Sequence, residues 1–157
     1  MSRVLIACSI DKISYKAARN YFENIHEKGD NIRIFHLHTP PVLQFNLQRG
    51  NKDAQAAADD IYEEKEEKMQ EKLENLKDEF EIPDELFEYC PLDTSDHSSK
   101  AEHIAHEILV EASQFKATKI IMGSRKACMD KKFLGSVSNL VGQEGTKKGI
   151  KVLVLEE

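Results

Sequence analysis

The sequence predicts an open α/β fold with a parallel sheet, and three observations support this prediction. Short apolar runs alternate along the chain with longer segments in which apolar residues recur at helical spacing. The first of these runs, residues 4–8, is continuously apolar, which is typical of a strand covered on both faces. Turn and capping residues separate the segments. Five strands alternating with four helices predict an open, Rossmann-like sheet with helices on both faces.

The first strand is predicted at residues 4–8, an apolar run of strand length. Ser14 is the predicted N-cap of the next helix, and Gly29 is predicted to close it. The second strand is predicted at residues 32–37. A strand, a helix and a strand in this short stretch form a βαβ unit.

A long helix is predicted from Asp53 to Phe80, with a narrow apolar stripe and many acidic residues. Residues 51–81 carry twelve acids and five lysines. This composition favours a solvated face on a crossover helix, although a surface for a protein partner is an alternative. The third strand is predicted at residues 86–90 and is stopped by Pro91. A helix with capping-box spacing begins at Ser99.

The fourth strand, residues 120–123, leads into a cationic loop, and a final helix and strand follow. Residues 125–132 carry four basic residues and one acid, a net charge of +3. Gly123 and Gly135 would let the backbone approach a ligand closely. Ser136 is the predicted N-cap of the last helix, whose free N–H groups would attract an anion. The loop therefore predicts a phosphate site.

Composition limits the classes of function. The chain of 157 residues fits one domain, residues 1–157, with 40% hydrophobic and 32% charged residues. The net charge is −6, and residues 51–81 account for −7 of it, so no broad basic face is predicted. Nucleic acid is therefore not an expected partner.

Three cysteines without paired spacing argue against a disulfide framework. No apolar stretch approaches the ~20 residues of a membrane span, and the N-terminus lacks a signal-peptide pattern. A cytoplasmic location without membrane association is expected.

Several other kinds of site are not favoured. The sequence contains no G-x-G-x-x-G or G-x-x-x-x-G-K-[ST] motif. His36 with His38, and His103 with His106, have spacings that can hold a metal, but hydrogen-bonded or exposed histidines are the preferred interpretation and no metal is expected. Cys128 is interpreted as an incidental loop thiol rather than a redox sensor. No catalytic arrangement is evident.

Taken together, the motifs resemble those of the universal stress protein family over nearly the whole chain. The family's nucleotide-binding members carry G-x2-G-x9-G-[ST] after the fourth strand. Residues 122–125 (Met-Gly-Ser-Arg) and 135–138 (Gly-Ser-Val-Ser) resemble the corresponding parts of this motif. Residues 36–37 with Pro40 resemble the end of its second strand, and residues 152–154 its terminal strand. Two positions differ: Lys126 stands at the second glycine with a spacer of eight residues, and Ser9 stands at the family's nucleotide-contacting aspartate.

The resemblance implies a sheet of order 3-2-1-4-5, a homodimer paired through the last strand, and ATP or AMP, with or without Mg²⁺, in a cleft. Three residues at the end of the first strand would line the adenosine, and Leu37 would offer its backbone to the base. The residues from Gly123 onward would surround the phosphates. Carried over by position, the predicted nucleotide-binding residues are Ala7, Cys8, Ser9, Leu37, Met122, Gly123, Arg125, Lys126, Gly135, Ser136, Val137 and Ser138.

The sequence thus predicts a nucleotide-binding stress-response regulator that is not an enzyme, with at most slow ATP turnover. The alternative is a family member that has lost nucleotide binding and acts as a dimeric interaction module, with the acidic helix as a contact surface. An adenylyl-transferring enzyme is a third hypothesis, but the chain lacks the His-x-Gly-His signature.

Overall fold

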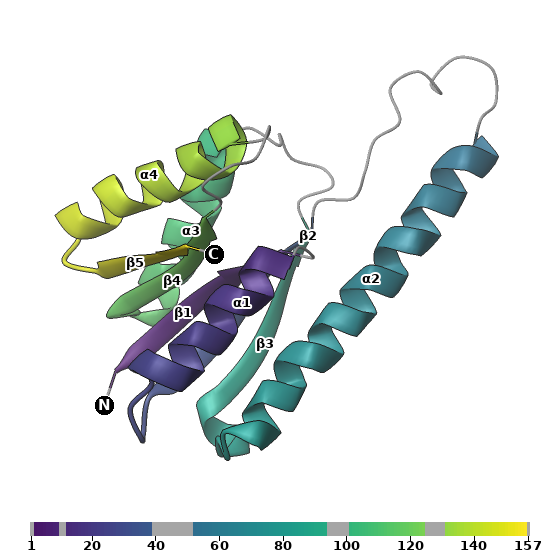
Figure 1. Ribbon diagram of the computed structural model, residues 1–157. Helices are drawn as coiled ribbons and strands as arrows, with labels where there is room; N and C mark the ends of the chain where they lie inside the picture. Colours follow the sequence, from purple (N-terminus) through teal and green to yellow (C-terminus); the bar gives the residue numbers. More distant parts are fainter. Residues whose placement is uncertain (1, 10–11, 39–51, 94–100, 125–130, 157) are drawn as a thin grey trace.

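The computed structural model describes residues 2–9, 12–38, 52–93, 101–124 and 131–156. In this part of the chain, five strands form one sheet in the order β3-β2-β1-β4-β5 (Figure 1). Every neighbouring pair is parallel. The predicted fold class and strand order are confirmed. The strands are β1 (Arg3–Cys8), β2 (Asn31–His38), β3 (Phe87–Asp93), β4 (Lys119–Ser124) and β5 (Lys151–Glu156).

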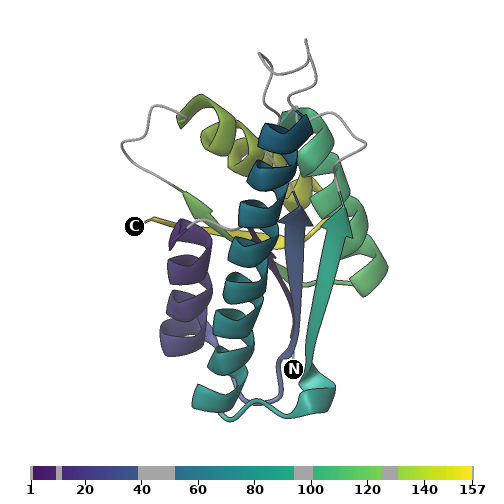
Figure 2. The same cartoon turned by 90° about the vertical axis from the view of Figure 1, so that its right-hand side faces the viewer.

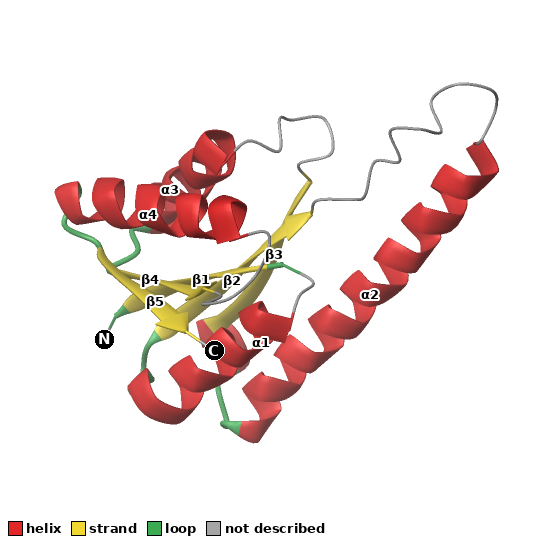
Figure 3. Ribbon diagram, turned by 45° about the horizontal axis from the view of Figure 1, so that its top comes forward, coloured by secondary structure: helices red, strands yellow, loops and turns green. Residues whose placement is uncertain are grey.

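The helices cover both faces of the sheet. Figure 3 shows α1 and α2 on one face and α3 and α4 on the other. A π-helical turn, Tyr21–Ile25, extends α1, and a short 3-10 turn, Asp84–Leu86, precedes β3. The four α-helices are α1 (Lys12–Asn20), α2 (Lys52–Glu79), α3 (Ala101–Phe115) and α4 (Lys131–Lys147).

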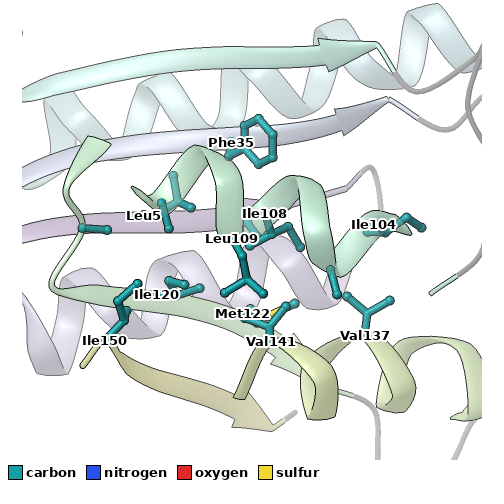
Figure 4. Close-up of a cluster of buried hydrophobic side chains, with 14 of the residues drawn as sticks. Leu5, Phe35, Ile104, Ile108, Leu109, Ile120, Met122, Val137, Val141 and Ile150 are labelled. Atoms are coloured by element: carbon teal, nitrogen blue, oxygen red, sulfur yellow. The ribbon is translucent and has the colours of Figure 1, made fainter. Parts of the chain in front are cut away.

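Successive strand residues point to opposite faces, so each strand contributes to two separate cores. Under α3 and α4, residues such as Leu5, Phe35 and Ile120 pack against Ile108 and Val141 (Figure 4). Under α1 and α2, the intervening strand residues pack against both helices. The main members of this second core are Val4, Ile6, Cys8, Ile32, Ile34, Ile121, Ala18, Tyr21, Phe22, Met69, Leu73 and Leu76.

The amino end of the sheet is held by a buried carboxylate. Asp30, which is fully buried, accepts hydrogen bonds from the backbone N–H groups of Ser2 (3.1 Å) and Glu27 (3.1 Å) and from the hydroxyl of Tyr21 (3.0 Å). Burial by itself would raise the pKa of Asp30, but these hydrogen bonds to the charged form outweigh burial and lower the pKa. The carboxylate joins the start of β1, the end of the first helical segment and the turn before β2.

The predicted boundaries of the first helix were wrong at both ends. The helix begins at Lys12, and Ser14 lies inside its first turn. The hydroxyl of Ser14 accepts a hydrogen bond from the N–H of Ser9 (3.0 Å), so it stabilises the connection from β1 instead of capping the helix. The helical segment ends at Ile25, and Gly29 adopts a positive φ of 95° in the turn that follows.

Two further boundaries differ from those predicted. Pro91 lies within β3, paired with His36, instead of ending the strand. A proline is tolerated there because β3 is an edge strand and its outer side needs no ladder hydrogen bond. The last helix begins at Lys131 rather than after Ser136, so Ser136 is not its N-cap. Lysine, phenylalanine and leucine before Gly135 can all adopt helical conformation, and the helix therefore starts earlier. The predicted capping role of Ser99 lies outside the described residues.

Candidate functional site

The candidate site lies at the carboxyl ends of β1, β2 and β4, on the face covered by α3 and α4. In an open parallel sheet, ligands bind outside these ends, where the strand order reverses. The reversal occurs here between β1 and β4. Ala7, Met122 and Val137 are buried members of one apolar cluster, and Leu37 packs against it. Four of the predicted residues, from three strands and α4, thus belong to or pack against one cluster, and Figure 4 shows Met122 beside Val141, with Val137 further along the same helix.

Cys8 does not lie with these four residues. Its side chain is 1% exposed and packs in the core under α1 and α2, because neighbours on a strand face opposite sides. Ser9 follows β1, and its hydroxyl oxygen lies 3.3 Å from that of Ser14. The end of β1 therefore presents paired hydroxyl groups near the strand reversal.

Gly123 has a packing role that was not predicted from the sequence. A Cβ built on it would lie 2.7 Å from Ile13 Cγ2 and 2.9 Å from the carbonyl oxygen of Ile13. The missing side chain therefore allows the first turn of α1 to pack directly on β4. A close approach that requires a glycine is therefore made by the protein itself, and the approach of a ligand to Gly123 stays a prediction.

The cationic part of the predicted site is described only in part. Arg125 and Lys126 lie outside the described residues. Gly135 and Ser136 lie within α4, beyond its first turn. Ser138 is buried although it is polar, and it follows Val137 on the same helix. The N–H groups at the start of α4 belong to the turn that begins with Lys131, so an anion-binding helix end would be centred there.

Sequence reasoning did not identify the pair His36 and Glu66. The His36 side chain is 1% exposed, and its Nε2 lies 2.9 Å from Glu66 Oε2 on α2. This confirms the interpretation of His36 as a hydrogen-bonded histidine. A histidine in a continuous apolar strand was the available signal, but its partner is thirty residues away along the chain. Within the described residues, no group of three potential ligands could hold a metal ion.

Two groups near these elements have altered pKa values. Burial, followed by the nearby Cys8 and Glu66, raises the pKa of Tyr89, whose ring centroid lies 5.9 Å from that of His36. Burial also raises the pKa of the Cys90 thiol, and Glu111 adds to this effect. Both groups are therefore held in their neutral forms near pH 7, which does not favour nucleophilic chemistry at Cys90.

None of the described helices is both long enough and apolar enough to cross a membrane. None of the curated proteins compared with the chain matches it. Solved structures do match. Hypothetical protein MJ0577 has a TM-score of 0.56 at 22% identity, over 99% of this chain and 96% of its own. A universal stress protein from Archaeoglobus fulgidus has a TM-score of 0.56 at 19% identity, over 99% of this chain and 44% of its own.

A third structure is a universal stress protein in complex with cAMP, with a TM-score of 0.57 at 15% identity, over 98% of this chain and 96% of its own. At these identities the structural matches show the fold. The sequence match is more specific, because the model of the universal stress protein family matches residues 1–147. With this match over most of its length, the chain belongs to the universal stress protein family.

Proposed function

We propose that this protein binds an adenine nucleotide, ATP or AMP, at the carboxyl ends of β1, β2 and β4, and acts as a regulator rather than as an enzyme. The observation that carries the proposal is the cluster of Ala7, Leu37, Met122 and Val137 at the point where the strand order reverses. Leu37 is only partly buried against this cluster, so it can offer a planar base an apolar contact at the end of β2. A related protein was solved in complex with cAMP, which also supports a nucleotide as the ligand class.

The phosphates are assigned to the cationic segment between β4 and the start of α4. Arg125, Lys126, Lys131 and Lys132 are its four basic residues on an otherwise acidic chain. Charged donors bind phosphate oxygens more strongly than neutral ones. The family motif has glycine at position 126, which lets the backbone approach a phosphate closely. The lysine here reduces this approach but supplies a positive charge instead.

Isothermal titration calorimetry with ATP, ADP and AMP at millimolar concentration, with and without Mg²⁺, tests the proposal. Binding heat and a raised melting temperature are expected, since a ligand that binds only the folded state stabilises it. Mass spectrometry of nucleotide released from freshly purified protein identifies the bound species. The absence of heat with all three nucleotides would falsify nucleotide binding.

The contribution of Lys126 can be measured separately. Lys126→Ala should weaken ATP binding by about 1–3 kcal/mol, the scale of a hydrogen bond to a charged group. AMP should lose less, because it lacks the outer phosphates. Lys148→Ala is the matched control, since Lys148 is exposed beyond the other end of α4. Equal affinity of the Lys126→Ala variant and the wild type for ATP would remove Lys126 from the site.

The second candidate function is a dimeric interaction module without a nucleotide, and Ser9 in place of the family's carboxylate favours it. In either case we propose a homodimer formed through β5. This strand is at the edge of the sheet, its Val154 is 38% exposed, and a groove of about 530 Å³ lies between it and α4. Pairing would cover an open apolar edge. Light scattering at micromolar concentration that gives only the monomer mass of 17.9 kDa would exclude the dimer.

A further inference from the structure

The helix α2 is attached to the sheet in two chemically different ways along its length. Its C-terminal half is held by buried Leu73 and Leu76 and by the bidentate pair between Arg19 and Glu79, at 2.8 and 2.9 Å. Phe80, just after the helix, stacks on Phe22 with ring centroids 5.5 Å apart. Apolar burial dominates this half, so it should remain attached in the folded protein.

The N-terminal half of α2 is less buried than the C-terminal half. None of residues 56–61 is buried, and Ile61 is 54% exposed. Tyr62 is buried, and one turn later Glu66 contacts His36. Figures 1 and 2 show that this end of the helix extends past the carboxyl ends of the strands and stands away from the sheet.

The hydrogen bond between Glu66 and His36 can break and re-form without unfolding the sheet. Glu66 is 19% exposed, so its carboxylate can return to water at little cost. His36 is 1% exposed and stays in the sheet, between its ladder partners Cys8 and Pro91. A hydrogen bond of 2.9 Å is directional and is lost over a small displacement. Opening should therefore begin at the N-terminal half of α2, while the apolar half stays in place.

The position of His36 connects α2 with the candidate nucleotide site. His36 and Leu37 are consecutive residues of β2 and face opposite sides of the sheet. His36 contacts α2 on one side, and Leu37 packs on the other against the cluster that contains Ala7 and Met122. A ligand that fixes the end of β2 therefore acts on both residues together.

We propose that the N-terminal half of α2 can detach from the sheet and that the His36–Glu66 contact, here called the latch, holds it in place. We also propose that a nucleotide bound at the end of β2 favours the attached state. The second part of this proposal rests on the proposed function, and the first part does not. A ligand can shift such an equilibrium only by binding the two states with different affinities, and the shared strand β2 supplies the physical connection.

Hydrogen exchange followed by mass spectrometry tests the latch in the full chain without ligand. Glu66→Ala should accelerate exchange in residues 56–66 about tenfold, as expected when a hydrogen bond to a charged group is lost. Residues 69–79 should be unaffected. Glu66→Gln keeps an oxygen acceptor for His36 and should restore most of the protection. Glu67→Ala, at the exposed neighbouring residue, is the matched control.

The outcomes separate the two parts of the proposal. Exchange in Glu66→Ala that equals that of Glu67→Ala overturns the latch, and so does equal acceleration along the whole of α2. With ATP present, exchange in residues 56–66 should slow in the wild type and not in Glu66→Ala, although the melting temperature of both rises. A rise in melting temperature without slower exchange in the wild type overturns the coupling alone. If calorimetry detects no binding heat, both the proposed function and the coupling are overturned. The latch is still tested in that case, because the exchange comparison is made without ligand.

Discussion

The two ends of the sheet differ in how their polar groups are used. At the amino end, Asp30 collects three donors, and Arg3 donates through Nη1 to the carbonyl of Phe115 at 3.0 Å. These bonds connect elements of the fold to one another. At the carboxyl end, the described polar groups include the hydroxyls of Ser9 and Ser14 and the His36–Glu66 pair.

The connections between elements differ in the same way. Those at the amino end are short, such as residues 26–30 and 116–118. Binding residues of a protein are found more often on the loops that a rigid scaffold holds, and in a parallel sheet ligands bind at the carboxyl ends of the strands. The comparison suggests that changes at the amino end will affect stability alone, and that changes at the carboxyl end will also affect binding.

The largest effect is expected from Asp30→Ala. The substitution leaves the hydroxyl of Tyr21 and two backbone N–H groups without their buried acceptor. A loss of about 3–4 kcal/mol in the free energy of unfolding is expected, measured by urea denaturation. Asp78→Ala, at an exposed position on α2, is the control. If the folded Asp30→Ala protein also lost nucleotide affinity, the two ends would not be independent.

Gly123→Ala should have the next largest effect, and at the other end of the sheet. The new Cβ would meet the backbone of Ile13 at 2.9 Å, so α1 must move. We expect a cost of about 1–3 kcal/mol in unfolding free energy, typical of overpacking. Because Ser14 of α1 is hydrogen-bonded to Ser9 at the end of β1, nucleotide affinity per folded molecule should fall as well. Denaturation and calorimetry on the same sample separate the two losses, and unchanged affinity would contradict this expectation.

A smaller effect is expected from pH. The pKa of Asp30 is lowered in the folded protein, so its ionised form contributes stability above the unfolded pKa of about 3.9. This contribution is lost as the pH falls from there through the lower folded pKa. The difference in melting temperature between the wild type and Asp30→Asn should therefore be constant above about pH 5 and should shrink below pH 4. A difference that grows as the pH falls would show that the carboxylate is not the stabilising form.

The smallest effect is expected from Gly142→Ala, which is also the control for Gly123→Ala. A Cβ on Gly142 would meet no atom within 4 Å, and the residue lies inside α4. Alanine favours a helix over glycine by about 0.5–1 kcal/mol, so the variant should be slightly more stable. Thermal denaturation measures the change. A loss of stability would indicate that α4 is packed against something at this position.

Much of the fold could be predicted from the sequence because its signals are local. The continuous apolar runs at residues 4–8 and 120–123 lie within observed strands, and the apolar stripe from Asp53 to Phe80 corresponds to α2 almost residue for residue. The strand order came from the family resemblance and not from spacing. The predicted helix starts were less reliable. Ser14 and Ser136 are residues that can cap a helix, but Ser14 bonds to Ser9 instead, and Ser136 lies inside α4.

For the candidate site, the sequence predicted which residues take part but not which way their side chains face. The resemblance pointed to Ala7, Leu37, Met122 and Val137, which belong to or pack against one apolar cluster, and their contact with a nucleotide stays a prediction. It also included Cys8, which faces the opposite core. Whether Arg125 and Lys126 contact a phosphate stays a prediction, since they lie outside the described residues.

The sequence by itself determined the alternation of strands and helices, the family and the location of the cationic segment, because each depends on neighbours along the chain. Only the tertiary structure decided which partner each polar or small residue has. Asp30 joins Ser2 to Tyr21, Gly123 makes room for Ile13, and His36 meets Glu66. These contacts join segments far apart in sequence, and they exist only after the apolar strands have assembled and excluded water around them.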